Sequence, residues 1–356
     1  MVKTEYYKDL TKMNTFGMRV KARCFIEYDS VADLVDIEFG ELTRPVLHIG
    51  GGSNLLFTDD FKGTVLHSKI DFIEILNECH RDGKVLVSVG AGVVFDDFCA
   101  WAANEDLWGV ENLSYIPGEV GASAVQNIGA YGVEVKDVIR KVYCYDTVEE
   151  EFVHFDVEEC GYGYRDSMFK RPEVKGRYIV THVVFALSRA PQPKLEYGHL
   201  KEAVADCHFE RSGSGDEKSL TPALIRKVII KIRKEKLPEP SVKGSAGSFF
   251  KNPVVPMEQF LKIEAAAKAE HGSDYKVPHY DLPDGMFKIP AAWMIEQCGW
   301  KGKRSGGAAV WDKQPLVIVN HTGEAYPEEI IGLEKRIIAS VRTRFGVELH
   351  PEVEHV

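Results

Sequence analysis

A long run rich in glycine and alanine, residues 109 to 132, constrains the fold of this chain more than any other feature. It follows a stretch, Phe95 to Leu107, whose pattern predicts a helix. Its core reads Ile116-Pro-Gly-Glu-Val-Gly-Ala-Ser-Ala-Val-Gln-Asn-Ile-Gly-Ala-Tyr-Gly132. Small residues let a backbone approach a neighbour closely, and a loop of this length needs a functional reason. We interpret the run as a loop that lays its backbone along a flat ligand or along its own sheet.

Two predicted strands each end in a glycine-rich turn. Val46 to Ile49 leads into Gly50-Gly-Gly-Ser-Asn54, and Val85 to Val89 leads into Gly90-Ala-Gly92. Successive amides in such turns can bind an anion. Taken alone, however, the triple glycine is a weak signal and favours a tight turn without a ligand. A phosphate-binding Gly-Lys-Ser/Thr loop is absent, and Leu55 stands where a dinucleotide fingerprint has its third glycine. Both of those nucleotide-binding families are therefore disfavoured.

The remaining patterns predict an α+β chain with a boundary near its polar stretch, Glu210 to Lys218, which we interpret as a mobile loop or linker. Before the boundary, strands are predicted at 139–145, 151–155 and 178–187. After it, the pattern is that of a helix-rich α/β unit. Its helices are expected from Thr221 to Lys236, Val255 to His271, Ala291 to Cys298 and Glu328 to Phe345.

Composition excludes several classes of protein. The 356 residues carry a net charge of −10, opposite in sign to a nucleic-acid-binding surface, and no apolar run reaches the ~20 residues of a membrane span. Seven cysteines without paired ligand spacing (24, 79, 99, 144, 160, 207, 298) indicate inert thiols rather than a disulfide framework or a metal site. We expect a cytoplasmic protein that binds neither nucleic acid nor membrane.

The motifs together resemble the UDP-N-acetylenolpyruvoylglucosamine reductase (MurB) family. The resemblance covers nearly the whole chain, through Asn14-Thr-Phe16, Gly50 to Asn54, Ile116 to Gly132, Tyr164-Arg-Asp-Ser167, Gly247-Ser-Phe-Phe-Lys-Asn-Pro253, Pro290 to Cys298, Gly306-Gly-Ala-Ala309 and Pro351-Glu-Val353. It implies a two-lobed FAD-binding module of the vanillyl-alcohol-oxidase type followed by a substrate-binding domain. The domains expected are residues 1–70 and 71–215 for the two lobes, 216–345 for the substrate domain, and 346–356 for a tail returning to the active site.

The resemblance implies an enzyme of peptidoglycan precursor synthesis that reduces UDP-N-acetylglucosamine enolpyruvate to UDP-N-acetylmuramate, with NADPH as hydride donor and FAD held noncovalently. Hydride addition leaves a carbanion next to a carboxylate, which needs charge stabilisation and then a proton. By resemblance, Arg165 and Glu352 flank that carboxylate and Ser248 donates the proton. Without the family match, the ordinary structural interpretation would make Arg165 part of a surface ion pair and Glu352 an exposed carboxylate of the tail. Ser248 would be a small residue that fits a turn.

The same resemblance assigns the ligand contacts. Residues expected to contact FAD are Gly50, Gly51, Gly52, Ser53, Asn54, Ala91, Gly92, Pro117, Gly118, Gly121, Ala122, Gln126, Asn127, Ala130 and Tyr131. Residues expected to bind substrate are Tyr164, Arg165, Tyr197, Lys236, Asn252, Lys301 and Gln314. Tyr197 marks the type I subclass, which closes a tyrosine loop over its substrate. Lys236 could instead be only the cationic end of a helix, and the basic cluster from Lys301 to Arg304 leaves open which cation meets phosphate. No metal is expected, no role is assigned to residues 205–220, and the chain is expected to be a monomer.

Two other functions remain as alternatives. The first is a flavin-dependent oxidase of a small alcohol or sugar, in the same broad fold, which would pass electrons to oxygen. The second is a noncatalytic sensor of a UDP-sugar or flavin, which would keep the glycine turns and Lys236 but has no reason to combine Arg165, Ser248 and Glu352. Ser248, Arg165 and Glu352 in their motifs argue against the oxidase, and slow reoxidation in air would do so too. For the sensor, Ser248→Ala should leave the function unchanged.

Overall fold

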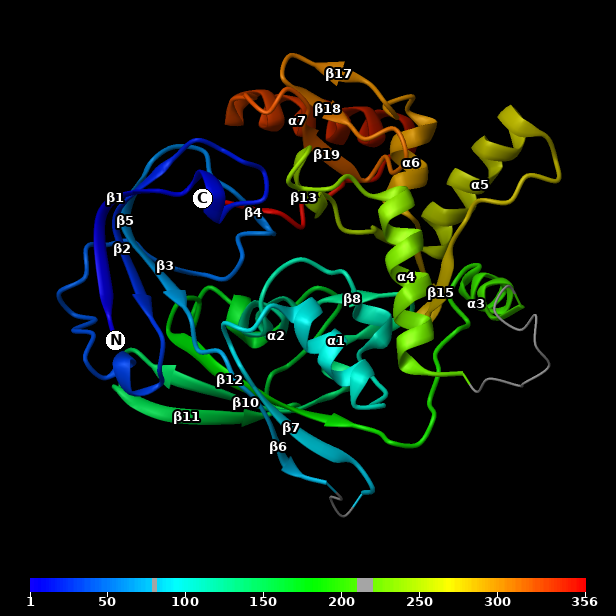
Figure 1. Ribbon diagram of the computed structural model, residues 1–356. Helices are drawn as coiled ribbons and strands as arrows, with labels where there is room; N and C mark the ends of the chain where they lie inside the picture. Colours follow the sequence, from blue (N-terminus) through cyan, green and yellow to red (C-terminus); the bar gives the residue numbers. More distant parts are fainter. Residues whose placement is uncertain (79–81, 210–219) are drawn as a thin grey trace. The chain divides into compact units, whose positions relative to one another are not determined.

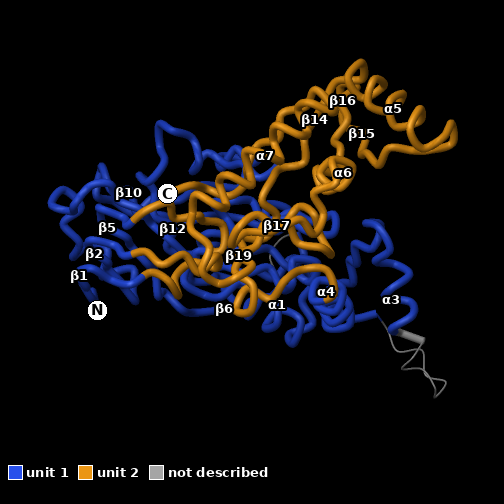
Figure 2. Tube along the Cα trace, turned by 90° about the horizontal axis from the view of Figure 1, so that it is seen from above, with its two compact units in different colours: residues 1–9, 21–52, 60–234 blue, residues 10–20, 53–59, 235–356 orange. Residues whose placement is uncertain are grey.

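The computed structural model describes residues 1–78, 82–209 and 220–356 (Figure 1). The chain forms two compact units, coloured separately in Figure 2. Unit 1 comprises residues 1–9, 21–52 and 60–234, and unit 2 comprises residues 10–20, 53–59 and 235–356. The predicted linker at 210–218 and Cys79 lie outside the described residues. The domain limits expected after residues 70, 215 and 345 stay predictions.

Unit 1 contains a four-stranded sheet in the order β1-β2-β5-β3, formed by Lys3–Asp9, Lys21–Tyr28, Phe61–Ser68 and Val46–Ile49. Strand β1 is antiparallel to β2, whereas β2 and β3 both run parallel to β5. Ile26 and Leu66 of this sheet pack in a buried cluster with Tyr145 and Ile179 of the next sheet. The predicted strand over Val46 to Ile49 is thus confirmed.

The second sheet of unit 1 is antiparallel throughout, in the order β11-β10-β12-β7-β6. Its strands are Glu151–Asp156, Ile139–Asp146, Tyr178–Leu187, Val85–Gly90 and Ile73–Asn77. The four strands predicted here are confirmed to within one residue at each end. Helices α1 (Phe95–Asn104) and α2 (Val120–Gln126) cover one face of the sheet (Figure 1). Phe98 of α1 packs against Phe185 of β12, with ring centroids 4.6 Å apart and the rings tilted by 35°.

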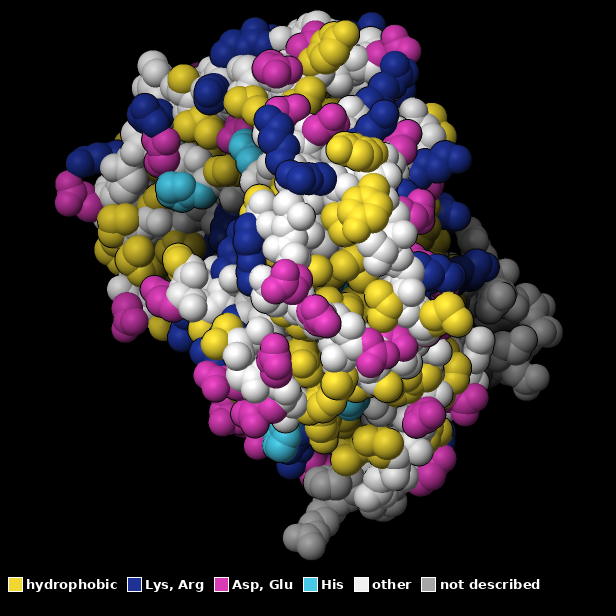
Figure 3. Space-filling view, turned by 90° about the vertical axis from the view of Figure 1, so that its left-hand side faces the viewer, with side chains coloured by type: hydrophobic (Ala, Val, Ile, Leu, Met, Phe, Trp, Pro, Cys, Tyr) yellow, Lys and Arg dark blue, Asp and Glu magenta, His cyan; other side chains and the backbone are white. Residues whose placement is uncertain are grey.

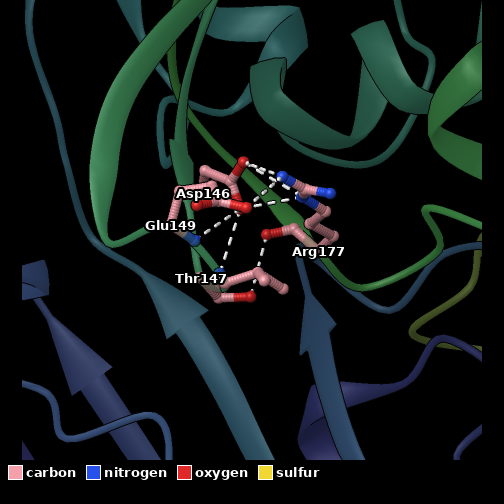
Figure 4. Close-up of polar contacts among 5 residues, drawn as sticks. Asp146, Thr147, Glu149 and Arg177 are labelled. Carbon is pink, nitrogen blue, oxygen red and sulfur yellow. Dashed lines mark hydrogen bonds and ion pairs between the residues drawn. The ribbon is translucent and has the colours of Figure 1, made fainter.

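An ion pair closes the β10–β11 hairpin against the start of β12 (Figure 4). Arg177 Nε lies 2.9 Å from Asp146 Oδ1, and its terminal nitrogen lies 2.7 Å from Oδ2. Asp146 also accepts from the amide of Val148, and Thr147 donates to the Arg177 carbonyl oxygen. Burial alone would raise the pKa of Asp146. Its hydrogen bonds to Arg177 and to the amides of Val148 and Glu149 outweigh this effect and lower the pKa below its ordinary value. This network serves the fold, not the ligand-binding turns.

Helix α3 (Leu200–Phe209) and helix α4 (Pro222–Lys236) form a further cluster in unit 1. Ile225 and Ile229 of α4 are buried with Leu200 of α3 and with Trp108. The α4 prediction is confirmed. The predicted helix over Phe95 to Leu107 was too long, because α1 ends at Asn104 and Asp106 turns the chain with a φ of 53°.

Unit 2 is built around an antiparallel sheet in the order β13-β19-β18-β17, formed by Gly244–Ser248, Val317–Asn320, Ala308–Val310 and Arg304–Ser305. Residues 10–20 join this unit, because Ser245 donates to the Thr15 carbonyl oxygen at 2.9 Å and Asn320 to that of Phe16 at 3.1 Å. Helices α6 (Ala291–Gln297) and α7 (Pro327–Phe345) pack together.

A smaller antiparallel sheet in unit 2, with the order β14-β16-β15, accompanies helix α5 (Met257–His271). Its strands are Val254–Pro256, Met286–Lys288 and Tyr280–Leu282. The helix predicted over Val255 to His271 was placed two residues too early at its start, because Val255 and Pro256 belong to β14. The other two helices predicted in this unit are confirmed to within one residue.

One face of the molecule carries side chains of both charge signs (Figure 3). On the face drawn in Figure 3, acidic and basic side chains alternate instead of gathering in one broad patch. Among the residues that the structure describes, no helix combines the length and apolar character needed to cross a bilayer.

Candidate active site

The Gly50–Gly52 turn follows β3 and lies against the Pro117–Gly118 turn, both within unit 1. A Cβ atom on Gly51 would lie 3.4 Å from the Cα of Gly118. Gly52 and Gly118 have φ values of 60° and 121°, which favour glycine. No described residue accepts a hydrogen bond from the amide of Gly51 or Gly118. Two adjoining turns with unpaired amides form a cradle suited to an anion such as a diphosphate.

The second glycine turn, at Ala91 and Gly92, is packed against the start of α2. The Gly121 amide donates to the Ala91 carbonyl oxygen at 3.0 Å, and a Cβ on Gly121 would lie 2.9 Å from the Cβ of Ala91. Ala122 in turn lies 3.2 Å from the position of a Cβ on Gly50. The structure therefore brings the predicted flavin residues at 50–52, 91–92 and 117–122 together within unit 1.

The prediction of one continuous loop over residues 109 to 132 was wrong. This segment contains a short 3-10 turn at Glu111–Leu113, helix α2, and strand β8 (Gly129–Ala130), which pairs with β9 (Val133–Glu134). The small side chains that favoured a loop instead let α2 pack tightly on the Ala91 turn. Asn127 ends the helix in a left-handed conformation, with a φ of 46°.

Glu119, a residue with no role predicted from the sequence, lies beside the cradle. One of its carboxylate oxygens is 3.2 Å from the position of a Cβ on Gly50, and the other is 3.0 Å from His67 Nε2. The His67 Nδ1 atom is 3.2 Å from a carboxylate oxygen of Glu27. The only sequence signal was the charged residue in Pro117-Gly-Glu119, because His67 lies in an ordinary strand pattern.

Asn127 and Gln126 connect the flavin motif to the Tyr164–Arg165 turn. Asn127 is buried, and its side-chain amide donates to the Gly163 carbonyl oxygen at 2.7 Å. This side chain therefore bonds to the protein itself. Lys170, which was not predicted, donates to Gln126 Oε1 at 2.7 Å and to the Arg165 carbonyl oxygen at 3.1 Å.

Arg165 itself is held by the same motif. Its guanidinium donates to the carbonyl oxygens of Asn127, at 3.3 Å, and Gly129, at 2.6 Å. The guanidinium carbon lies 5.3 Å from the centroid of the Tyr164 ring. These contacts fix the orientation of a planar cation, a group that matches the geometry of a carboxylate.

Tyr131 and Tyr197 meet edge to face, with ring centroids 6.0 Å apart and an interplanar angle of 85°. Asn112, also absent from the prediction, holds both segments, because its amide donates to the carbonyl oxygens of Tyr131 and Lys194 at 2.9 and 2.7 Å. Ala130 precedes Tyr131 in β8. The structure thus joins one predicted flavin residue to the predicted substrate tyrosine.

In unit 2, the Ser248 segment lies beside the end of the chain. The Glu352 amide donates to the Phe249 carbonyl oxygen at 2.8 Å, and the Lys251 amide donates to that of His350 at 2.9 Å. Ser248 ends β13 after Gly247, whose φ is 69°, and Ser248 is exposed. The residues that carry a hydroxyl group and a carboxyl group therefore lie in two hydrogen-bonded segments of one unit.

Ser53 and Asn54 belong to unit 2, although they complete the glycine motif in the sequence. The Asn54 side-chain amide donates to the Glu352 carbonyl oxygen at 3.1 Å. Strand β4 (Leu55–Leu56) then pairs in parallel with β20 (Glu354–His355). Asn54 therefore contacts the backbone that carries Glu352, a contact that the sequence did not indicate.

The residues expected to bind UDP are also in unit 2, except for Tyr197. The Lys236 carbonyl oxygen accepts from Trp311 Nε1 at 3.0 Å, and Asn252 Oδ1 accepts from the Ala291 amide at the start of α6. Lys301 is in an exposed ion pair with Glu296 at 2.7 Å. Gln314 caps a turn, because its side-chain oxygen accepts from the Leu316 amide at 3.4 Å.

The described residues fit FAD and offer no competing metal centre. The unpaired amides of Gly51 and Gly118 suit its diphosphate, and glycines at both turns leave room for a ligand. In the described part of the chain, no three His, Cys, Asp or Glu side chains form a cluster that could hold a metal ion. The six described cysteines are free, and burial raises the pKa of Cys99 and Cys144 well above the ordinary value, which keeps both thiols protonated.

Two family profiles match the chain. One, described as UDP-N-acetylenolpyruvoylglucosamine reductase, C-terminal domain, matches residues 239–356. The other, described as an FAD binding domain, matches residues 22–155. The second match includes both glycine turns of the cradle.

Curated relatives match over almost the whole length. A UDP-N-acetylenolpyruvoylglucosamine reductase from Bacteroides fragilis is 51% identical, over 98% of this chain and 98% of its own. One from Porphyromonas gingivalis is 43% identical, over 98% and 97%. A crystal structure of the MurB enzyme from Thermus caldophilus covers 100% of this chain and 98% of its own, with a TM-score of 0.65 and 22% identity. That likeness supports the two-domain α+β fold.

Proposed function

Because this chain belongs to the UDP-N-acetylenolpyruvoylglucosamine reductase family, we propose how its residues carry out that family's reaction. The chain is an FAD-dependent oxidoreductase that uses NADPH to reduce UDP-N-acetylglucosamine enolpyruvate to UDP-N-acetylmuramate, in peptidoglycan synthesis. When bound, FAD would supply the hydride chemistry that links NADPH to the vinyl carbon of the substrate. The proposal concerns what the protein's own residues contribute to that reduction.

We assign FAD to the cradle of unit 1, with its diphosphate on the amides of the Gly50–Gly52 and Pro117–Gly118 turns. The supporting observation is the pair of unpaired amides at Gly51 and Gly118. Ala91, Gly92, Gly121 and Ala122 contribute a closely packed floor without large side chains. Asn127 acts by holding the turn at Gly163, since its side-chain amide is already bonded there.

Arg165 binds the substrate carboxylate. Hydride addition places negative charge on the carbon next to this group, and a fixed guanidinium stabilises that charge more than it stabilises the neutral enol ether. Because two backbone carbonyls orient the guanidinium beforehand, little reorganisation is needed when the charge forms. Glu352 donates a hydrogen bond from its protonated carboxyl group to the same carboxylate.

Ser248 then protonates the carbanion. The observation that carries this step is the bond between the Glu352 amide and the Phe249 carbonyl oxygen, which holds the Ser248 segment beside Glu352. A serine hydroxyl is a weak acid, so the step depends on its position next to a strongly basic carbanion. Lys236, Asn252, Lys301, Gln314 and Tyr197 bind the UDP part, with Tyr197 covering it as in the type I subclass.

Anaerobic visible spectroscopy of the purified protein tests this assignment. NADPH should bleach the flavin band, and UDP-N-acetylglucosamine enolpyruvate should then restore it. In Ser248→Ala, bleaching should be unchanged, while reoxidation by substrate should slow by about 10²- to 10⁴-fold, the usual contribution of a positioned proton donor. The exposed Ser241 of the same unit supplies the control variant Ser241→Ala, which should behave like the wild type.

Other outcomes would contradict the proposal. Equal losses in both half-reactions of Ser248→Ala would make Ser248 a structural residue. A flavin band that returns only when oxygen is admitted would favour the oxidase of a small alcohol or sugar. Protein that binds no flavin would contradict the cofactor assignment.

We also propose that the enzyme works as a monomer in the cytoplasm. Its nucleotide substrate and NADPH carry several negative charges, so neither crosses a bilayer unaided. Both half-reactions therefore need a compartment where these metabolites are made. Size-exclusion chromatography with light scattering should give a mass near 39.9 kDa, and twice that mass would contradict the monomer.

A further inference from the structure

A histidine is buried between two carboxylates directly beneath the cradle of unit 1. His67, at the end of β5, lies 3.0 Å from Glu119 and 3.2 Å from Glu27 of β2. The exposed fractions of the three side chains are 7%, 12% and 27%, respectively. Each imidazole nitrogen thus faces one carboxylate, an arrangement that a protonated imidazole satisfies with two donated hydrogen bonds.

Glu119 brings negative charge to the place where the cofactor's diphosphate is expected. It directly follows Gly118, and its second oxygen lies 3.2 Å from the position of a Cβ on Gly50. An uncompensated carboxylate at this depth would repel a diphosphate on the same turns, because the interaction is poorly screened. The cradle therefore needs a positive group close to Glu119.

We propose that His67 is a positioning residue for FAD. His67 neutralises Glu119 and ties it to β2, so that the two turns can accept a diphosphate. The inference rests on the proposed placement of FAD over the Gly50–Gly52 and Pro117–Gly118 turns. His67 itself does not touch the cofactor. It acts through Glu119, and Glu27 on the outer side holds the second imidazole nitrogen.

Of His67, His48 and Tyr28, only His67 has a pKa that makes it change charge near neutral pH. Burial lowers the pKa of His67, but the hydrogen bond and charge of Glu119, and then those of Glu27, outweigh this effect and raise it above 6.5. Burial, followed by the charge of His67, lowers the pKa of His48 on β3 to about 4. Burial raises the pKa of Tyr28, whose hydroxyl lies 2.7 Å from His48 Nε2. His48 and Tyr28 thus stay neutral while His67 titrates.

Affinity for FAD, measured by fluorescence titration of the flavin-free protein, tests the proposal. In His67→Gln, the dissociation constant of FAD should rise about tenfold at pH 6.5, the size of one charge interaction in a half-buried site. Adding Glu119→Gln to that variant should restore the constant to within about twofold of the wild type. His154→Gln, at an exposed histidine of the same unit, should leave it unchanged.

The pH profile provides a second readout. A raised pKa means that the compensating charge is present at low pH and is lost as the pH rises through that pKa, so the wild type should bind FAD more weakly above it. His67→Gln should show no such change. If Glu119→Gln fails to restore affinity, or the wild-type profile is flat, His67 has only a packing role.

A further variant separates this inference from the placement of FAD. Gly51→Val puts a branched side chain against Gly118, so it should weaken FAD binding whatever His67 does. If Gly51→Val binds FAD like the wild type while its circular dichroism is unchanged, FAD does not lie on these turns. That result would overturn the proposed placement and the inference together, whereas normal weakening in Gly51→Val with an unaffected His67→Gln would overturn the inference alone.

Discussion

Arg165 shows how a single residue is prepared for a charged ligand. Its φ of 53° lies in the left-handed region, which costs a residue other than glycine about 1 kcal/mol or more. Carbonyl oxygens of Asn127 and Gly129 hold the guanidinium, while Lys170 holds the Arg165 carbonyl oxygen. The hydrogen bonds offset the backbone cost and keep the cation in place for the carboxylate that we propose it binds.

Lys170→Met should therefore impair the substrate half-reaction through Arg165. Losing the bonds to Arg165 and Gln126 frees the turn, so flavin reoxidation by substrate should slow by about tenfold, the loss expected for one charge-assisted hydrogen bond. Flavin bleaching by NADPH should be unchanged in rapid-mixing spectroscopy. Lys175→Met, at an exposed lysine five residues away, is the matched control. A loss shared by both half-reactions would show that Lys170 only supports the fold.

The sequence singles out candidate residues for the site but not the contacts that hold them. Motif resemblance pointed to Arg165, Ser248 and Glu352, because their neighbours are distinctive. It did not indicate Lys170, Asn112 or His67. Most of the hydrogen-bond partners of these three side chains are 19 or more residues away in the sequence. Hydrogen bonds between distant segments leave no local pattern, so only the folded chain reveals them.

Helix α2 illustrates how tertiary contacts decide an element. Gly121 within it disfavours a helix by roughly 0.5–1 kcal/mol relative to alanine, and its small neighbours fit a loop equally well. The missing side chain allows the Gly121 amide to reach the Ala91 carbonyl oxygen at 3.0 Å, and a Cβ there would be too close to Ala91. Strands such as β10 and β12 were predictable because their short runs are rich in β-branched and aromatic residues.

The paired strands β4 and β20 give the end of the chain a defined path. Glu354 donates its amide to the Asn54 carbonyl oxygen at 3.0 Å, and the Val356 carbonyl oxygen accepts from the Thr58 amide at 2.7 Å. These bonds flank Glu352 on its C-terminal side, while its own amide is bonded to Phe249. Glu352 is therefore held by backbone on both sides.

Truncation after Leu349 should slow flavin reoxidation by substrate at least 100-fold and leave bleaching by NADPH intact, because it removes the carboxyl group and its strand. Glu352→Gln keeps the strand and tests the carboxyl group alone, and it should show most of the same loss. Stopped-flow absorbance under anaerobic conditions measures both steps. Normal turnover by the truncated protein would remove the tail from the proposed site.

At the scale of the whole molecule, cofactor binding should be coupled to stability. A ligand that binds only the folded state stabilises it by about 2.7 kcal/mol at 100 times its dissociation constant. Saturating FAD should therefore raise the melting temperature of the flavin-free protein by about 5 to 10 °C in a calorimetric scan. FMN, which lacks the diphosphate linkage, should give a smaller rise. Equal shifts from both flavins would argue against a diphosphate cradle.

The two units are interleaved along the chain, since residues 10–20 and 53–59 belong to unit 2 although unit 1 surrounds them in sequence. During synthesis on the ribosome, these early segments emerge long before β13, β19 and β20, with which they pair. They must stay unpaired until roughly the last hundred residues have left the exit tunnel. Unit 2 therefore cannot fold from the C-terminal part of the chain alone. Cutting the gene near residue 235 would separate unit 2 from two pieces of itself, and two-plasmid complementation at that point should yield poorly folded halves.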